Sequence, residues 1–239
     1  MSERRFAGGP PWIVWRDHIR VQLARLHDLG LNFDPDRLPS VAQDAWHIDE
    51  YCHPLRPEPP GEPVQKGSFE IAKRLLRGYE FADPARIRAY YMADAPLELR
   101  DMLLEIRYLF LRVRVGVRIG VVFDGVREIV GRSVRVWGWA YQTLDGHLER
   151  GQMDYQVWKW LDTGEVEYRI HAVSQLAEIR NPILNLGFRL LGRREQVLFA
   201  RRCGERMERL VNSRLSGGDA ERSSTGATGI LASPASAHR

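Results

Sequence analysis

Apolar and polar residues alternate through the centre of the chain, most clearly in Leu111–Phe123. Its odd positions from 113 to 121 are valine or isoleucine, whereas the even positions from 112 to 120 are arginine or glycine. A period of two predicts a strand with one face in a core and the other face in water. The same alternation predicts further strands at Ser133–Thr143, Gln152–Leu161 and Glu165–Leu176.

Short connections join the last three of these strands. Residues 162–164, Asp-Thr-Gly, form a typical hairpin turn between the last two. Because each pair is linked by a short turn, we expect Trp137–Thr143, Gln152–Leu161 and Glu165–Leu176 to be consecutive antiparallel strands.

Helical spacing of apolar residues marks both ends of the chain. Trp12–Leu29 predicts a helix that Gly30 can end, with apolar residues recurring every three or four positions. Near the other end, an Asn-Pro pair at 181–182 begins a long helix whose apolar stripe continues to Val211. Gly187 and Gly192 are the positions where that helix can bend.

Two shorter helices are predicted before the strands. Ser68 is a suitable cap for a helix through Leu76, which Gly78 can end. An Asp-Pro pair at 83–84 is a second start signal, and we expect that helix to run to about Tyr91.

Segments poor in structural signals divide the chain. Five prolines between Pro54 and Pro63 block helices and strand ladders alike, which predicts a linker or a strap on the surface. Met1–Pro11 and the Ser-, Gly- and Ala-rich Ser216–Arg239 are expected to be disordered. The predicted organisation is therefore an N-terminal helix and strap at 1–66, a core domain at 67–214 and a tail at 215–239. We expect removal of residues 1–63 to leave a folded core.

Composition favours a soluble globular protein in a reducing compartment. Hydrophobic residues make up 44% of the 239 positions, which suffices for a sizeable core. Cys52 and Cys203 provide neither a disulfide framework nor a four-cysteine zinc site, so a cytoplasmic location and no metal or other cofactor are expected. The N-terminus has no signal-peptide pattern, and no stretch approaches the length of a membrane span.

The formal charge of +4 is concentrated in one segment. Arg189–Arg214 contains eight arginines and three glutamates, so the rest of the chain is close to neutral. This segment fits an anionic membrane surface or an acidic partner, but the arginines equally fit the wet face of an amphipathic helix. Nucleic acid is disfavoured as a partner, because no nucleic-acid fold signature or phosphate loop is present.

One block of sequence resembles a known family. Trp137–Tyr155, WGWAYQTLDGHLERGQMDY, resembles the strand–loop–strand core of the family named domain of unknown function 1990. Residues 172–174, Ala-Val-Ser, resemble a later Ala-Phe-Ser of that family, and the arginine-rich C-terminal helix also matches. The resemblance runs from about Phe69 to Val211 and leaves the N-terminal helix and the strap as additions.

The chain departs from the family pattern at three places. Gln142 stands where the family usually has glycine, and Asp145 stands where it has proline. Gln152 and Met153 replace an acidic pair, so a carboxylate role at these two positions is lost here.

The order of predicted elements also resembles the helix-grip fold of the START and Bet v 1 proteins. This resemblance implies an α+β fold, in which a curved antiparallel sheet packs against a long C-terminal helix and leaves a pocket between them. The function that it implies is binding of a small apolar or amphipathic molecule. The alternatives are an enzyme that uses the same pocket and a non-catalytic interaction module that works through the basic helix.

The family block supplies the candidate site residues. Tyr141, Thr143, His147 and Glu149 lie at one strand end and in the loop that follows it. His147 titrates near neutrality and is the candidate acid or base, with Tyr141 or Glu149 beside it. The alternative is a tight turn in which Thr143 and His147 cap backbone groups. We expect His147→Ala to impair ligand binding or activity more than stability.

Two further strand positions complete the candidate ligand-binding set, His171 and Ser174. A hydrogen-bonded sheet histidine is the alternative for His171. Four tryptophans occupy alternating strand positions: Trp137, Trp139, Trp158 and Trp160. We favour a role as large core residues, and the alternative is that they form a wall of the pocket.

A second polar cluster precedes the proline-rich segment. Histidine, carboxylate and cysteine side chains of the kinds that bind zinc gather in residues 47–53, at His47, Asp49, Glu50, Cys52 and His53. Three of them would have to converge in space, and a solvated loop is the favoured interpretation.

Overall fold

The computed structural model describes residues 19–42, 45–108, 111–177, 182–217, 224–225 and 229–234. Within them, nine strands form one antiparallel sheet in the order β1-β7-β6-β5-β4-β3-β2-β9-β8. The helices are α1 (Ile19–Leu26), the 3-10 turn η1 (Pro35–Arg37), α2 (Ser68–Arg77) and α3 (Pro182–Leu215). The strands are β1 (His47–Leu55), β2 (Ile87–Met92), β3 (Asp101–Tyr108), β4 (Leu111–Ile129), β5 (Arg132–Thr143), β6 (Glu149–Trp160), β7 (Val166–Leu176), β8 (Ser224–Thr225) and β9 (Ile230–Ser233).

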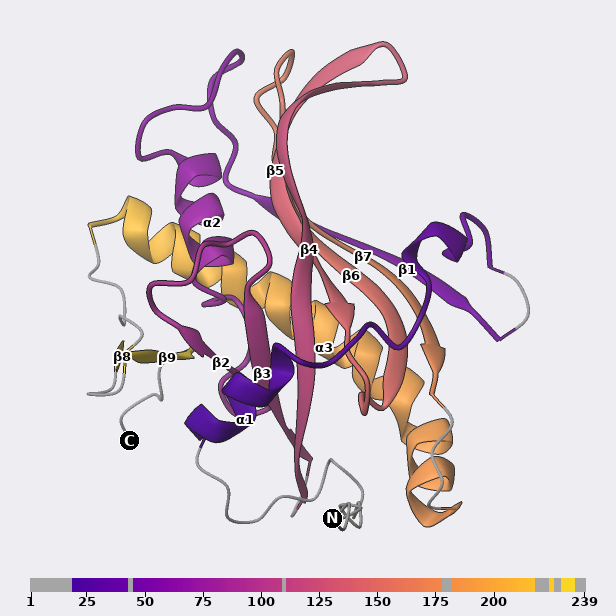
Figure 1. Cartoon of the computed structure of the whole chain (residues 1–239). Coiled ribbons are helices and arrows are strands. Elements are labelled where there is room, and N and C mark those ends of the chain that lie inside the picture. The colour runs from indigo at the N-terminus through magenta and orange to yellow at the C-terminus, as the bar shows by residue number, and fades with distance from the viewer. Residues whose placement is uncertain are drawn as a thin grey trace, which may run out of the picture.

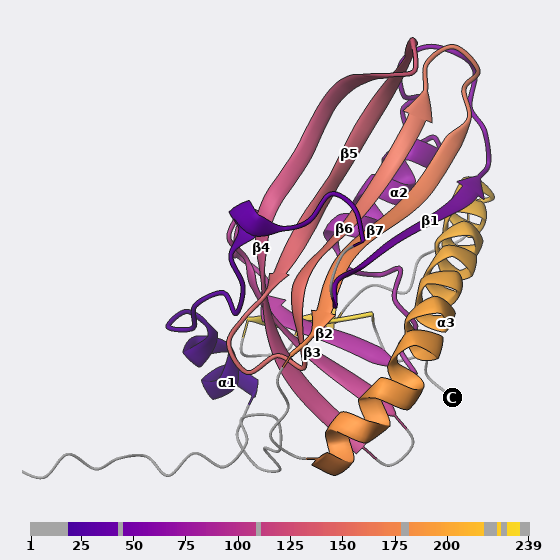
Figure 2. The same cartoon turned by 90° about the vertical axis from the view of Figure 1, so that its right-hand side faces the viewer.

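The sheet curves around the long C-terminal helix. Figures 1 and 2 show α3 running across the concave face, with α2 beside it and α1 on the opposite face. The strands β5, β6 and β7 pair consecutively and antiparallel, as the alternation predicted. The predicted fold, a curved antiparallel sheet packed against a long C-terminal helix in the helix-grip manner, is confirmed.

The predicted alternation in β4 is confirmed from Val113 to Ile119, whereas a register shift after Ile119 leaves Val121 39% exposed. Val115, Val117 and Ile119 are buried in the main core between the sheet and the helices. The other face of the strand holds α1, because Arg118 donates from Nη2 to the carbonyl oxygen of Leu26 over 2.9 Å. The part of the predicted first helix before Ile19 lies outside the described residues, as does the predicted tail apart from short pieces.

The helix expected from residue 83 to about Tyr91 is wrong. Asp83 caps only a turn, in which its Oδ1 accepts from the backbone N–H of Ala85 over 3.0 Å. Strand β2 follows, with Ile87 opposite Ile106 in β3. Pairing on both sides overrides the local start signal, because β2 lies between β3 and β9.

The expected disorder of the tail is wrong for β9. Residues 230–233, Ile-Leu-Ala-Ser, pair antiparallel with β2, and Leu231 lies opposite Tyr91. Four residues with little polar character extend the sheet, although the surrounding composition is typical of disorder.

The strap expected to lie outside the core belongs to it. Strand β1 pairs with β7 along its whole length, from His47 opposite Ser174 to Leu55 opposite Val166. The proline-rich residues that follow carry Glu58, whose Oε2 accepts from Lys159 Nζ over 2.8 Å in the interior. The segments before and after residue 66 therefore share one sheet and one core, and the predicted boundary there does not divide the structure.

Candidate ligand-binding groove

Aromatic side chains cluster in the interior between the sheet and the helices. Trp139 and Tyr155 pack with ring centroids 5.0 Å apart, and Phe81 lies 4.6 Å from Tyr155. Trp139 donates from Nε1 to the carbonyl oxygen of Leu76 in α2 over 3.1 Å, which ties the sheet to the helix. These contacts fill the described space between β5, β6 and α2 with aromatic rings.

A groove of about 360 Å³ opens at one side of the sheet, between β1, β7 and α3. Strand β1 contributes four consecutive residues, 50–53, because an edge strand presents both of its faces to such a groove. The remaining walls are Tyr168 and Ile170 of β7 and Ala200, Arg201 and Gly204 of α3.

The groove combines an apolar wall with a polar rim. Tyr168, Ile170 and Ala200 are buried hydrophobic residues. At the rim, His53 Nε2 lies 2.8 Å from Glu208 Oε2, and the Arg201 Nε donates to Glu205 Oε1 over 2.8 Å. Such an arrangement accommodates an apolar body with a polar end.

The approach of α3 to β1 depends on a glycine. A Cβ atom at Gly204 would lie 2.7 Å from Nδ1 of His53, closer than real Cβ contacts. Glycine inside a helix costs about 1 kcal/mol relative to alanine. At Gly204 this cost is accompanied by a close approach of α3 to His53 that a larger side chain would prevent.

Four buried tyrosines lie in the main core, namely Tyr79, Tyr141, Tyr155 and Tyr168, the last of which also lines the groove. Loss of hydration raises the pKa of each hydroxyl, and the nearby Cys203 thiol adds to the rise. The Tyr155 hydroxyl lies 2.9 Å from Met153 Sδ. The buried hydroxyls of Tyr79 and Tyr168 have no hydrogen-bond partner among the described residues.

The loop that carries the family block is held by local hydrogen bonds. The Thr143 hydroxyl accepts from the backbone N–H of Gly151 over 2.9 Å and lies 2.6 Å from Oδ1 of Asn32. Nδ1 of His147 accepts from the backbone N–H of Glu149 over 3.0 Å. These are the contacts expected of a turn in which Thr143 and His147 cap backbone groups.

The environment of His147 lowers the pKa of its imidazole to about 4, chiefly because burial disfavours the charged ring. The Glu149 backbone opposes this shift only in part. At neutral pH the ring is therefore neutral, and its Nδ1 lies 3.0 Å from both the backbone nitrogen and the carbonyl oxygen of Glu149.

The predicted site residues do not all share one face of the sheet. Tyr141 lies in the main core, and the buried Ser174 alternates with His171 along β7. His171 is half-exposed, with Nδ1 lying 3.6 Å from Oδ2 of Asp154, and this contact raises the pKa of the imidazole. Since neighbouring residues of a strand point to opposite faces, His171 and Ser174 belong to different surfaces.

The sequence singled out Glu50, Cys52 and His53 of β1 as possible metal ligands but gave no sign that they line a groove together with Tyr51. The stretch with Tyr51, Cys52 and His53 was expected to be a solvated loop because of the prolines after it, and it is a strand. Its alternation also distributes Glu50 and Cys52 to the face opposite that of His53. Among the described residues, no group of three histidine, cysteine or acidic side chains converges on a metal position.

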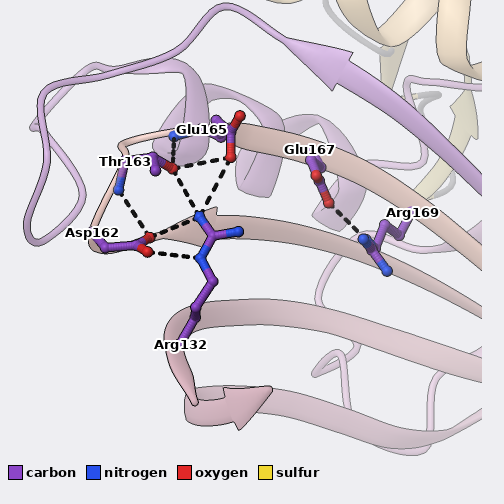
Figure 3. Close-up of polar contacts among 6 residues, drawn as sticks. All are labelled: Arg132, Asp162, Thr163, Glu165, Glu167 and Arg169. Atoms are coloured by element: carbon purple, nitrogen blue, oxygen red, sulfur yellow. Dashed lines mark hydrogen bonds and ion pairs between the residues drawn. The ribbon is translucent and has the colours of Figure 1, made fainter. Parts of the chain in front are cut away.

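A further polar cluster joins the ends of two hairpins. Figure 3 shows Arg132 of β5 between Asp162 and Glu165, with its Nε donating to Asp162 Oδ2 over 2.7 Å. The same contact lowers the pKa of Asp162. Beside it, Glu167 accepts from Nε of Arg169 over 2.7 Å. The cluster is open to solvent and positions the hairpins rather than a ligand.

The basic C-terminal helix uses several arginines within the molecule. Arg214 Nη2 donates to Glu80 Oε2 over 2.7 Å, and Arg206 donates to the carbonyl oxygen of the same residue. Arg202 lies 3.6 Å from Asp83. Within the part of the chain that the structure describes, no helix is both long and apolar enough to cross a lipid bilayer.

The model of a family described as "Domain of unknown function (DUF1990)" matches residues 29–206. This match includes β1 and the proline-rich segment, which the sequence resemblance had placed outside the family domain. A search of curated proteins found no match.

Two solved structures show low similarity. The crystal structure of Ara h 8.0201 is 9% identical, with 70% of this chain and 99% of that chain covered and a TM-score of 0.41. The crystal structure of human STARD10 is 8% identical, with 87% of this chain and 85% of that chain covered and a TM-score of 0.36. Neither similarity carries an argument about function.

Proposed function

We propose that this chain, which belongs to the family described as domain of unknown function DUF1990, binds a small apolar or amphipathic molecule in the groove between β1, β7 and α3. The single observation that carries this proposal is the groove itself, about 360 Å³ in volume at the edge of a core rich in aromatic rings. A space of this size suits a molecule at the lower end of the usual ligand range.

The composition of the groove supports an amphipathic ligand. The apolar side chains of Ile170 and Ala200 form the inner wall, where an apolar body loses contact with water. At the rim, Arg201 pairs with Glu205 and His53 lies beside Glu208, so polar side chains there can contact the polar end of a ligand. A ligand would therefore place its polar end outward or carry only neutral polar atoms.

Catalysis by His147 is the less supported alternative. His147 is absent from the groove lining, and a pKa of about 4 leaves it neutral and weakly basic at pH 7. The expectation that His147→Ala impairs ligand binding more than stability stays a prediction. Equal ligand-induced stabilisation of the wild type and His147→Ala would contradict it.

A pocket-filling substitution tests the groove. Ala200→Leu adds three carbons to its wall, whereas Ala24→Leu makes the same change at an exposed position of α1. The probe is anilinonaphthalene sulfonate, whose fluorescence rises in an apolar site. We expect saturable binding by the wild type and Ala24→Leu, and at least tenfold weaker binding by Ala200→Leu.

Two results would contradict the proposal. One is equal affinity of all three proteins for the probe. The other is absence of saturable binding to the wild type, combined with native mass spectra of the purified protein that show no additional mass. A co-purified molecule that is lost in Ala200→Leu but retained in Ala24→Leu would support it.

A further inference from the structure

We propose that residues 55–60, the proline segment, dock into a groove of a partner protein that is lined by aromatic rings and has an acidic side chain at one end. The proline segment follows β1 and lies outside the lining of the ligand groove, so the proposed function makes no use of it. Its backbone conformation and its pattern of exposure both point to this kind of partner.

Covalent geometry sets the backbone of the proline segment. The pyrrolidine rings of Pro57, Pro59 and Pro60 hold φ near about −65°. The residue before each of these prolines is confined to the extended or polyproline II region. Residues 56–60 belong to neither a helix nor a strand, because β1 ends at Leu55. The segment is therefore expected to form a polyproline II helix, which has three residues in each turn.

The exposure of the side chains has the same period of three. Leu55 is 6% exposed and Glu58 is 9% exposed, whereas the two residues after each of them are exposed, namely Arg56, Pro57, Pro59 and Pro60. A strand alternates with a period of two and would bury Pro57 together with Leu55. One ridge of the helix thus faces the core, and two ridges face outward.

The inward ridge is fixed to the core by hydrogen bonds. Glu58 Oε2 accepts from Lys159 Nζ over 2.8 Å, and the backbone N–H of Glu58 donates to the carbonyl oxygen of Gly164 over 2.9 Å. The backbone N–H of Gly61 donates to the carbonyl oxygen of Leu161 over 2.7 Å. Figure 1 shows the connection between β1 and α2 at the end of the molecule where the β4–β5 and β6–β7 hairpins also end. Because the segment is already held in place, docking costs little conformational entropy.

The two outward ridges determine which partner fits. A polyproline II helix is triangular in cross-section, so a groove contacts two ridges while the third faces away. Here the third ridge is the one that the core holds, and the other two are exposed. Pro57 and Pro60 lie three residues apart on one of them, which is the PxxP spacing that aromatic-lined grooves recognise.

Arg56 on the other outward ridge supplies a direction. Its side chain is exposed and forms no ion pair with any described residue. A guanidinium group pairs most strongly with a carboxylate, and a charged pair fixes the register of an interface. The partner's groove is therefore expected to have an acidic side chain beside its aromatic rings.

Titrations with purified SH3 domains test the assignment, because their grooves are lined by aromatic rings and bind PxxP segments. The domains are chosen to have acidic side chains beside the groove. Calorimetry measures their affinities for the full-length wild type, the double variant Pro57→Ala with Pro60→Ala, Arg56→Glu and Pro96→Ala. Pro96 is an exposed proline between β2 and β3, so its substitution is the matched control. Thermal melting without a partner shows whether each variant is folded.

We expect the wild type and Pro96→Ala to bind at least one of these domains with a Kd below about 1 mM. The double proline variant should bind about tenfold more weakly, because two apolar rings no longer enter the groove. Arg56→Glu should bind about fivefold more weakly, because the charge at that end is reversed. The melting temperatures should stay close to that of the wild type, since the substituted side chains are exposed.

Three results would overturn the inference. The first is that the wild type binds none of the domains. The second is equal binding by the folded double proline variant and Pro96→Ala. The third is an affinity that Arg56→Glu leaves unchanged. If the double proline variant were unfolded, Arg56→Glu would decide alone, because it keeps every proline of the segment.

Discussion

The buried pair of Glu58 and Lys159 is where the proline-rich segment is joined to the core. The side chains are 4% and 0% exposed, and Lys159 Nζ lies 2.8 Å from Glu58 Oε2. The same carboxylate accepts from the backbone N–H of Phe69 in the first turn of α2 over 2.8 Å. Because Gly67, the N-cap of α2, makes no side-chain capping bond, Glu58 takes over that role from a distant position.

Removing one charge of this pair leaves the other buried without its partner. Lys159→Met keeps most of the side-chain volume and isolates the carboxylate, so we expect a loss of about 3–5 kcal/mol in the free energy of unfolding. Glu58→Gln isolates the ammonium group and is expected to cost a similar amount. In the double variant no charge is buried, and its cost should fall below the sum of the two by about 2 kcal/mol or more.

Urea denaturation followed by tryptophan fluorescence measures these differences, with thermal melting as a second readout. A loss of 3–5 kcal/mol corresponds to a decrease of about 10 °C in melting temperature for a chain of this size. Arg201→Met is the control, because that arginine is 74% exposed in its pair with Glu205, and it should cost under about 0.5 kcal/mol. Single variants of Glu58 and Lys159 that match this control, or strictly additive costs, would refute the reasoning.

Three further predictions follow from the fold. Deletion of residues 1–63 removes β1 and Glu58 together. Contrary to the expectation from the sequence, we therefore expect the truncated protein to lose cooperative thermal unfolding. A sharp thermal transition in the truncated protein would show that the strap is dispensable. The pKa of His147 is about 4 in the folded state, against an ordinary value of 6.5, so its contribution to stability is present above pH 6.5 and declines by about 3 kcal/mol as pH falls to 4. His147→Ala should flatten that decline in urea titrations at several pH values, and an unchanged slope would contradict the burial of this ring. Gly151 has a φ of +144°, and a Cβ there would lie 2.0 Å from the Val173 carbonyl oxygen. We therefore expect Gly151→Ala to lower the free energy of unfolding by several kcal/mol. Gly125→Ala is the control, because a Cβ at Gly125 meets open space, and it should cost under about 1 kcal/mol in the same urea titration.

The main strands could be predicted from the sequence because their signal is local. In β4 the valines at 113, 115 and 117 share one face through the pleat alone, whatever the strand packs against. The hairpin turn at residues 162–164 and the long C-terminal helix depend on neighbouring residues in the same way. The family block at 137–155 identified the family for the same reason, since it is one contiguous segment.

The groove could not be predicted in this way. His53 and Gly204 are far apart in the chain and meet only because β1 is the edge strand beside α3. The prolines after β1 suggested a loose strap, and no local pattern shows that Glu58 finds Lys159 across the sheet.

Residue alternation and helical spacing thus determined which segments became strands and helices, with the exception of segments such as β2, where pairing on both sides outweighed a helix start signal. The tertiary structure alone decided which segment closed the edge of the sheet, which glutamate capped α2 and where the interior stayed open. The physical reason is that a backbone conformation is selected by adjacent side chains, whereas a groove is the space left when distant elements pack, and its shape is a property of their contact.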